Sequence, residues 1–262
     1  MKVGFIGCGN MGGALARAVS QNTQIKVYIS DYNEEKALAF SKEIGAEKSD
    51  NITISKECDF IFLGVKPNVV EAVLEGIKEA LGSNGHGVLV SMAAGVSLDK
   101  LAATVGERAV IRIMPNTPVA VGCGMISWCK SSAVTDETAR AFEEILGCAG
   151  KLLAIDEKLI DAATAVAGCG PAFVYMFTEA LADGAVSCGL PRDAALIMAA
   201  ETVRGAAEMI LKSGKHPEKL KDDVCSPGGS TIVGVQALER GAFRADTAGA
   251  VIAAYEKTKK LG

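Results

Sequence analysis

Residues 2–12 read KVGFIGCGNMG, a short apolar strand pattern that runs into a glycine-rich turn and then into a helix. The turn matches the pattern G-x-G-x-x-G through Gly7, Gly9 and Gly12. The first glycine of this pattern allows a tight turn, the second lets the backbone approach a pyrophosphate, and the third lets the helix pack on the strand. A purely structural glycine turn is the alternative, but the position between a strand and a helix favours a dinucleotide-binding loop.

Strand and helix patterns alternate from this loop onward. The apolar strand patterns cover 2–7, 25–29, 59–65, 87–91, 109–114 and 124–128. The helical patterns between them cover 11–21, 33–44 and 69–81. Residues 59–65 (DFIFLGV) are almost continuously apolar, as expected when helices cover both faces of a sheet. The alternation predicts an α/β fold with a parallel, doubly wound sheet, that is, an N-terminal Rossmann dinucleotide-binding domain.

The second part of the chain has helical spacing and no convincing strand pattern. It is rich in alanine, glycine and methionine, for example over 194–211, and it is more apolar than covering one sheet requires. We therefore expect a Rossmann domain over 1–156 and an all-α C-terminal domain over 157–262 that forms a subunit interface.

Composition narrows the partners. The chain has 262 residues, is 49% hydrophobic and carries a net charge of −4 without a basic block, so nucleic acid and anionic membranes are not expected partners. Its eight cysteines form no C-x-x-C or Cys/His cluster, so we expect no metal site and interpret them as small buried side chains in a reducing cytosol. No signal-peptide pattern and no uninterrupted apolar run of about 18 residues is found, which favours a cytoplasmic protein.

The ends of the predicted strands carry polar residues. Asp31 follows the second strand about 20 residues after the glycine loop, where an acidic residue binds the ribose 2′-OH of NAD and repels the 2′-phosphate of NADP. Asp31 could instead cap the next helix, and Ser30 beside it could serve a phosphate. Lys66 and the small residues 93–95 end two further strands and face the same expected crevice.

A second loop predicts an anion site. Residues 226–231 read SPGGST just before an apolar helical segment. We expect Ser226 to cap this helix, Pro227 to open it, and the glycines to leave backbone N–H groups free for an anion. Ser230 and Thr231 add two hydroxyl groups.

No general base is evident. The two histidines, His86 and His216, lie beside glycine or proline and are interpreted as surface residues. Because oxidation of an alcohol usually needs a base, this favours a substrate that accepts hydride easily, such as a protonated imine.

Seven segments together make the chain resemble the pyrroline-5-carboxylate reductase family from end to end. They are GFIGCGNMG (4–12), GVKPN (64–68), SMAAGV (91–96), RIMPNTP (112–118), AGCGPAF (167–173), EALADGAVSCGLPR (179–192) and KDDVCSPGGSTI (221–232). The resemblance implies a Rossmann domain followed by a helical dimerisation domain, and reduction of 1-pyrroline-5-carboxylate to proline by NADPH or NADH. It also implies a homodimer or larger assembly.

The resemblance also implies site residues. The cofactor positions it implies are Gly7, Cys8, Gly9, Asn10, Met11, Gly12, Ser30, Asp31, Asn51, Gly64, Val65, Lys66, Pro67, Ala93, Ala94 and Gly95. The substrate positions it implies are Glu157, Gly228, Gly229, Ser230 and Thr231. In this family, the threonine that matches Thr231 is the one expected to hydrogen-bond the ring nitrogen during catalysis. Cys169 and Cys225 stand where the family commonly has serine, and Asp31 is unusual for an enzyme that uses NADPH.

Other functions remain open from the sequence. A β-hydroxyacid dehydrogenase would carry a lysine where Val174 stands. A non-catalytic NAD(P) sensor would bind nucleotide without turnover, and the PGGST loop argues against a pure interaction module. The homologous six-membered imino acid is also open as a substrate, because one methylene in a pocket contributes only about 1–3 kcal/mol.

Overall fold

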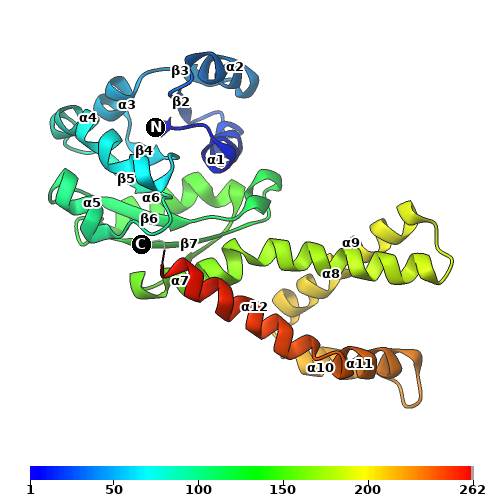
Figure 1. Cartoon of the computed structure of the whole chain (residues 1–262). Helices are drawn as coiled ribbons and strands as arrows, with labels where there is room; N and C mark the ends of the chain where they lie inside the picture. The colour runs from blue at the N-terminus through cyan, green and yellow to red at the C-terminus, as the bar shows by residue number, and fades with distance from the viewer. Residues whose placement is uncertain (261–262) are drawn as a thin grey trace. The chain divides into compact units, whose positions relative to one another are not determined.

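A computed structural model describes residues 1–260 of the chain, and its N-terminal part is built on one eight-stranded sheet (Figure 1). The strands lie in the order β3-β2-β1-β4-β5-β6-β7-β8. Their bounds are β1 Lys2–Ile6, β2 Lys26–Ser30, β3 Glu47–Lys48, β4 Phe60–Leu63, β5 Val88–Ser91, β6 Val110–Met114, β7 Gly124–Lys130 and β8 Gly150–Ala154. The predicted Rossmann-type α/β fold is therefore confirmed.

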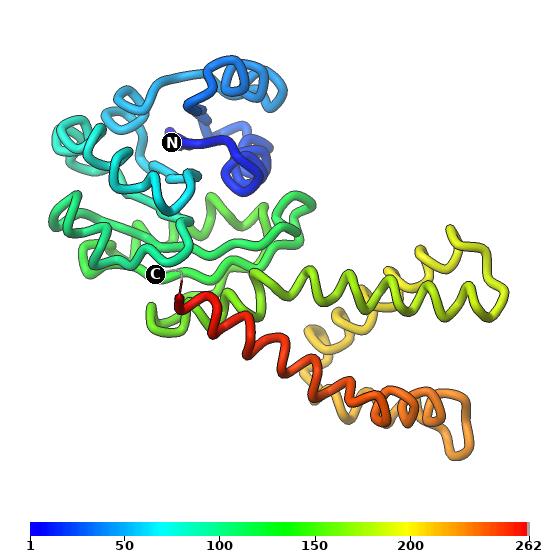
Figure 2. The backbone as a smooth tube through the Cα atoms, in the orientation of Figure 1, coloured from blue at the N-terminus to red at the C-terminus, as the bar shows by residue number. Residues whose placement is uncertain are grey.

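The first strand lies inside the sheet. β1 pairs in parallel with β2 on one side and with β4 on the other. In Figure 2 the backbone runs outward through the blue segments and returns through cyan to green, so the strand order reverses next to β1. A parallel sheet binds its ligand at such a reversal, beyond the carboxyl ends of the strands.

The sheet is not wholly parallel, which corrects the sequence-based expectation. β7 pairs antiparallel with β6, with Arg112 opposite Cys129. Only a short segment joins the two strands, and most of it is the 3-10 helix η2 (Thr117–Val121). A parallel return would need a crossover of a dozen or more residues, so this connection permits only an antiparallel strand.

Apolar side chains project from both faces of the sheet into two buried clusters. On one face Phe5 stacks on Phe62, with ring centroids 4.6 Å apart, in the same cluster as Trp128 and Phe142. On the other face Ile61 and Leu63 belong to a second buried cluster. The helices that cover the sheet are α1 Asn10–Ser20, α2 Glu34–Ile44, α3 Asn51–Glu57, α4 Val70–Ser83, α5 Leu98–Val105 and α6 Asp136–Leu146.

Local capping defines both ends of α2, which agrees with the helical pattern over 33–44. The Asn33 side chain accepts a hydrogen bond from the N–H of Lys36, and Gly45 ends the helix in the left-handed conformation with φ 69°. Asn33 is therefore the N-cap residue, and the alternative in which Asp31 caps this helix is wrong.

The structure divides into two compact units. The first is Met1–Cys169 with the segment from Ala254, and the second is Gly170–Ala253. The predicted division at residue 156 stays a prediction. Beyond β8, the elements are η4 Glu157–Leu159, α7 Ile160–Ala163, the π-helical turn η5 Thr164–Gly168, α8 Gly170–Ser187, α9 Arg192–Ser213, α10 Pro217–Asp223, α11 Ser230–Arg240 and α12 Phe243–Thr258.

The second unit buries little of its apolar surface within one chain. α8 and α9 pack through Ala182, Ala195 and Ala199, whose small side chains allow close approach. Larger apolar side chains stay exposed, among them Tyr175, Met176, Ile197, Met198 and Leu211. This is the pattern of a surface that a partner covers.

Two expectations from composition need correction. The helical stretch Glu157–Ser187 is long and apolar enough, by length and composition, to cross a membrane, although one such helix is weak evidence. This stretch was not predicted from the sequence, because each apolar run was ended at a glycine. Glycines within the stretch lower its mean hydropathy only a little. Of the cysteines, only Cys8, Cys58 and Cys129 are buried, and Cys123, Cys148 and Cys188 are exposed.

Candidate active site

Three glycines bring β1, α1 and the end of β4 into contact. A Cβ atom on Gly12 would lie 2.3 Å from the carbonyl oxygen of Gly7, and one on Gly64 would lie 2.4 Å from the same oxygen. Gly7 itself has φ +96° and donates its N–H to the Ser30 carbonyl at 2.7 Å. Larger residues would push these elements apart, so the sequence motif is required here by packing as well as by any ligand.

Gly9 faces open space. It is the N-cap residue of α1 with φ −68°, it makes no side-chain cap, and a Cβ atom placed on it would meet nothing within 4 Å. The N–H groups of the first helical turn, which includes Asn10, Met11 and Gly12, have no partner inside the helix. They form the positive end of the helix dipole, so the space in front of Gly9 suits a pyrophosphate.

Asp31 is tied to this loop. Its Oδ2 accepts the Cys8 N–H at 2.8 Å and lies 3.3 Å from the Cys8 Sγ, and its Oδ1 accepts the Asn33 N–H at 3.0 Å. Burial acts to raise the pKa of Asp31, but the hydrogen bonds from Asn33 and Cys8 outweigh it and hold the pKa below its usual value. Burial, reinforced by this hydrogen bond to Asp31, raises the pKa of the Cys8 thiol to about 11. The loop therefore carries a fixed carboxylate and a neutral thiol.

Ser30 and Asn51 form a second pair at the end of β2. The Ser30 hydroxyl donates to Oδ1 of Asn51 at 2.6 Å, and Ser30 is only 6% exposed. Asn51 is the first residue of α3, whose preceding residue Asp50 accepts the Thr53 N–H. The sequence patterns had not indicated α3, which has only 7 residues and makes about two turns.

The other predicted cofactor residues follow the carboxyl ends of β4 and β5. Gly64 donates its N–H to the Ile6 carbonyl at 2.8 Å, and Lys66 is exposed before the 3-10 turn η1 (Pro67–Val69). Ala93 is buried, and Gly95 turns the chain with φ +74°. The residues expected to hold the cofactor thus line one edge of the sheet, beyond β2, β1, β4 and β5; Val65, Pro67 and Ala94 belong to the same two turns.

Glu157 lies against the same sheet. Its Oε1 accepts the Leu98 N–H at 2.7 Å and the Arg112 Nη1 at 3.0 Å. Arg112 is 5% exposed, and Asp161 lies 3.9 Å from its Nη2. Sequence reasoning missed this contact, because nothing in the chain marks a pairing between residues so far apart.

Asn116 occupies a junction. Its Oδ1 accepts the Met125 N–H at 2.8 Å, while its Nδ2 donates to the Ala167 carbonyl at 3.0 Å. It is 8% exposed. The side chain therefore joins the ends of β6 and β7 to η5, and both of its polar atoms are engaged within the protein.

The second predicted loop lies in the Gly170–Ala253 unit. Gly228 adopts φ +69°, and Gly229, the N-cap residue of α11, donates its N–H to the Ser226 carbonyl at 3.0 Å. Ser226 therefore closes a turn and does not cap the helix, Pro227 lies in this turn and does not open the helix, and the Gly229 N–H is not free. All three expectations were wrong. The helix starts at Ser230, so the free N–H groups belong to its first turn. Ser230 and Thr231 are exposed.

Charges and histidines complete the description. Asp223, shortly before the loop, pairs with Lys215 at 3.4 Å and with Lys219. His216 accepts the Glu218 N–H as the N-cap of α10, and His86 is an exposed partner of Asp59 at 3.3 Å. Both histidines are surface residues, as predicted.

Comparisons with known proteins agree along the whole chain. The family model for pyrroline-5-carboxylate reductase dimerisation matches residues 157–261, and the model described as NADP oxidoreductase, coenzyme F420-dependent, matches residues 2–95. Pyrroline-5-carboxylate reductase of Arabidopsis thaliana is 41% identical, covering 99% of this chain and 95% of the relative. That of Escherichia coli (strain K12) is 40% identical, covering 99% and 98%.

A solved structure gives the same answer. The crystal structure of Plasmodium falciparum pyrroline carboxylate reductase with NADP bound superposes with a TM-score of 0.87 at 36% identity, covering 100% of this chain and 98% of that one. The resemblance drawn from the seven sequence segments is confirmed. With relatives this similar over nearly its whole length, the chain belongs to the pyrroline-5-carboxylate reductase family.

Proposed function

We propose that this chain reduces 1-pyrroline-5-carboxylate to L-proline with hydride from NADPH or NADH, the final step of proline biosynthesis. The observation that carries the proposal is full-length membership of this reductase family, together with a glycine loop whose open side fits a pyrophosphate. The reaction adds hydride to the carbon of the protonated imine, whose nitrogen keeps the proton that it already carries and becomes the ring amine.

The residues at the sheet edge fit a nicotinamide dinucleotide. The first-turn N–H groups of α1 would hold the pyrophosphate in front of Gly9, and the end of β2 would hold the adenosine ribose beside Ser30, Asp31 and Asn51. The turns 64–67 and 93–95 would place the nicotinamide half beyond β4 and β5. When bound, the reduced nicotinamide supplies the hydride.

The loop at 228–231 would hold the substrate. The carboxylate of the substrate suits the free N–H groups and the Ser230 hydroxyl at the start of α11, where the helix dipole favours an anion. Thr231 Oγ1 would hydrogen-bond the ring nitrogen and so orient the imine. Glu157 is a further proposed substrate residue, and Arg112 and the Leu98 N–H fix one of its oxygens. Orientation and electrostatics would supply most of the rate.

The proposed partners are the small-molecule substrate and a second copy of the chain. The exposed apolar side chains of α8 and α9, within the residues matched by the dimerisation family, support self-association. Cysteines that are all free in the described structure fit a reducing cytoplasm. Light scattering on the purified protein tests the assembly, and a monomer would contradict it.

The activity test follows loss of the absorbance of the reduced cofactor with pyrroline-5-carboxylate, using NADH and NADPH in parallel. Turnover that falls in Thr231→Ala and is largely kept in Thr231→Ser supports the proposal. Binding of nucleotide without any turnover would contradict it and favour a sensor. Running the six-membered imino acid beside the substrate measures how strongly the pocket selects ring size.

A further inference from the structure

The end of β2 presents a charged carboxylate where the adenosine ribose is expected. Asp31 is fixed by three donors, the N–H groups of Cys8 and Asn33 and the Cys8 thiol. A carboxylate has about four acceptor positions, so one of its oxygens can still accept a hydrogen bond from a ribose hydroxyl. Its side chain is 17% exposed, which leaves it accessible from the cofactor edge.

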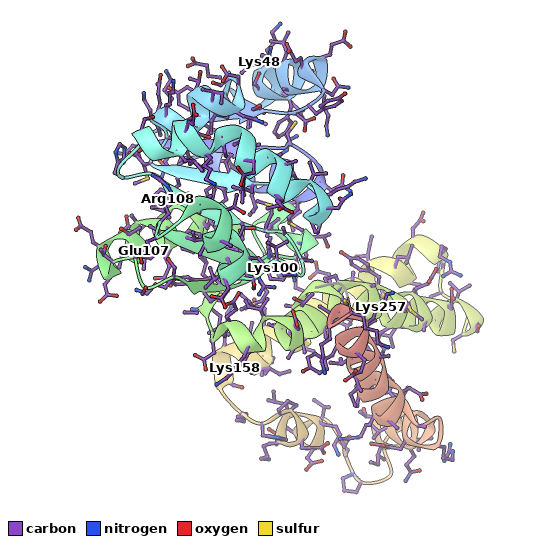
Figure 3. The ribbon with its side chains drawn as sticks, turned by 60° about the vertical axis from the view of Figure 1, so that its left-hand side comes forward. Lys48, Lys100, Glu107, Arg108, Lys158 and Lys257 are labelled. Atoms are coloured by element: carbon purple, nitrogen blue, oxygen red, sulfur yellow. The ribbon has the colours of Figure 1, made fainter. Side chains whose placement is uncertain are left out.

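The surrounding charge is mostly negative. Glu34 and Glu35 occupy the first turn of α2, directly after Asp31 in the chain. The nearest basic group, Lys36 Nζ, lies 4.0 Å from the Asp31 Oδ2 and so serves that carboxylate. Lys48, labelled in Figure 3, donates to Glu34 Oε2 at 2.7 Å. A 2′-phosphate would therefore meet acidic groups whose neighbouring lysines are already paired.

The Ser30 hydroxyl, which could otherwise donate a hydrogen bond to a phosphate, is engaged within the protein. Ser30 donates its proton to Asn51 Oδ1 at 2.6 Å and is nearly inaccessible. A neutral donor at this position would offset a phosphate's charge by hydrogen bonding, but here the donor proton is used inside the protein. The engaged Ser30 hydroxyl is an observation independent of the Asp31 carboxylate. Both favour a cofactor without a 2′-phosphate.

We propose that Asp31 makes this chain select NADH over NADPH, by accepting a hydrogen bond from the free ribose 2′-OH and repelling the 2′-phosphate. The inference rests on the proposed function in one respect, that the dinucleotide binds at the glycine loop. A 2′-phosphate brings up to two negative charges into a setting that holds Asp31 ionised, and like charges placed together lower affinity strongly. We expect NADH to bind on the order of 100-fold more tightly than NADPH.

The test measures binding without substrate, so that it does not depend on turnover. Calorimetric titration of the full-length protein with NADH, NADPH, ADP-ribose and adenosine 2′,5′-bisphosphate gives the four dissociation constants at low and high salt. The variants are Asp31→Asn, which removes the charge at constant shape, and Asp31→Ser, which also opens the site. Asp136→Asn, at an exposed aspartate of α6, is the matched control for net charge. Urea midpoints confirm that each variant is folded.

The inference predicts three results. Wild type and Asp136→Asn prefer NADH, the preference falls below about 5-fold in Asp31→Asn and Asp31→Ser, and it narrows in high salt because the discrimination is electrostatic. NADPH binding as tightly as NADH to wild type would overturn the inference and make Lys36 the ligand of the 2′-phosphate. A preference that survives both substitutions would also overturn it. Cofactor binding without turnover would instead contradict the proposed function alone.

Discussion

Substitution of Gly12 by alanine should separate the structural from the ligand-binding role of the glycine loop. The new Cβ would lie 2.3 Å from the Gly7 carbonyl oxygen and 3.3 Å from the Gly64 Cα. Since the nearest atom belongs to the backbone, the start of α1 would have to move by about 1 Å to restore ordinary contact. Overpacking of this kind destabilises by about 1–3 kcal/mol, which lowers Tm by roughly 2–12 °C in a chain of this size.

Gly9→Ala is the matched variant three residues earlier. Its Cβ would meet nothing within 4 Å and its φ of −68° suits any residue, so only a weaker helix N-cap is expected, about 0.5 kcal/mol. The same Cβ would occupy the space in front of the first-turn N–H groups. We therefore expect Gly9→Ala to stay folded and to bind NADH at least about 10-fold more weakly.

Urea unfolding followed by circular dichroism, and NADH titration of the folded proteins, read out the two effects. An unchanged urea midpoint in Gly12→Ala would refute the packing argument. Wild-type affinity for NADH in Gly9→Ala would refute the assignment of the open space to the pyrophosphate. Wild type defines the reference for both measurements, and Gly9→Ala controls for adding a methyl group to the loop.

Three further outcomes are expected. Thr231→Ala should lower kcat by about 10- to 1000-fold in the spectrophotometric assay, and an unchanged kcat would remove this hydroxyl from the mechanism. Arg112→Leu should lower the free energy of unfolding by about 1–3 kcal/mol because the half-buried Glu157 loses its partner, and adding Glu157→Gln should recover part of the loss; equal urea midpoints would contradict this. The pKa of Asp31 is lowered on folding, since its hydrogen bonds outweigh the effect of burial. Its contribution to stability is therefore complete above the ordinary pKa of 3.8 and is lost as the pH falls through the folded value, so Asp31→Asn should show a shallower acid-side loss in urea titrations.

Local rules account for what could be predicted from the sequence. The strands around β1 were evident because both of their faces are buried, which makes a run such as Phe60–Leu63 wholly apolar. Gly45 ended α2 where its left-handed conformation requires glycine. The loop at 7–12 was recognised because close approaches at Gly7 and Gly12 demand residues without a side chain, while Gly9 leaves the space in front of α1 open.

Features decided by tertiary contacts were not predictable in this way. The antiparallel β7 depends on the length of its connection, while its residues resemble those of a parallel strand. The turn at Ser226 looked like a helix cap, because serine before proline occurs in both settings. The contacts of Asp31 with Cys8 and of Arg112 with Glu157 join residues that only the sheet brings together.

The contacts of residues 157–169 determine where this chain can be cut or fused. Glu157 neutralises the buried Arg112, Ile160 is fully buried, and the Ala167 carbonyl receives the Asn116 amide. A truncation after β8 would leave the buried Arg112 guanidinium without its carboxylate partner. It would also expose the apolar side chains of Met114 and Cys129 that pack with Ile160. Chimeras that exchange helical halves between relatives should therefore be spliced after the π-helical turn, so that each nucleotide-binding half keeps its own residues 157–169.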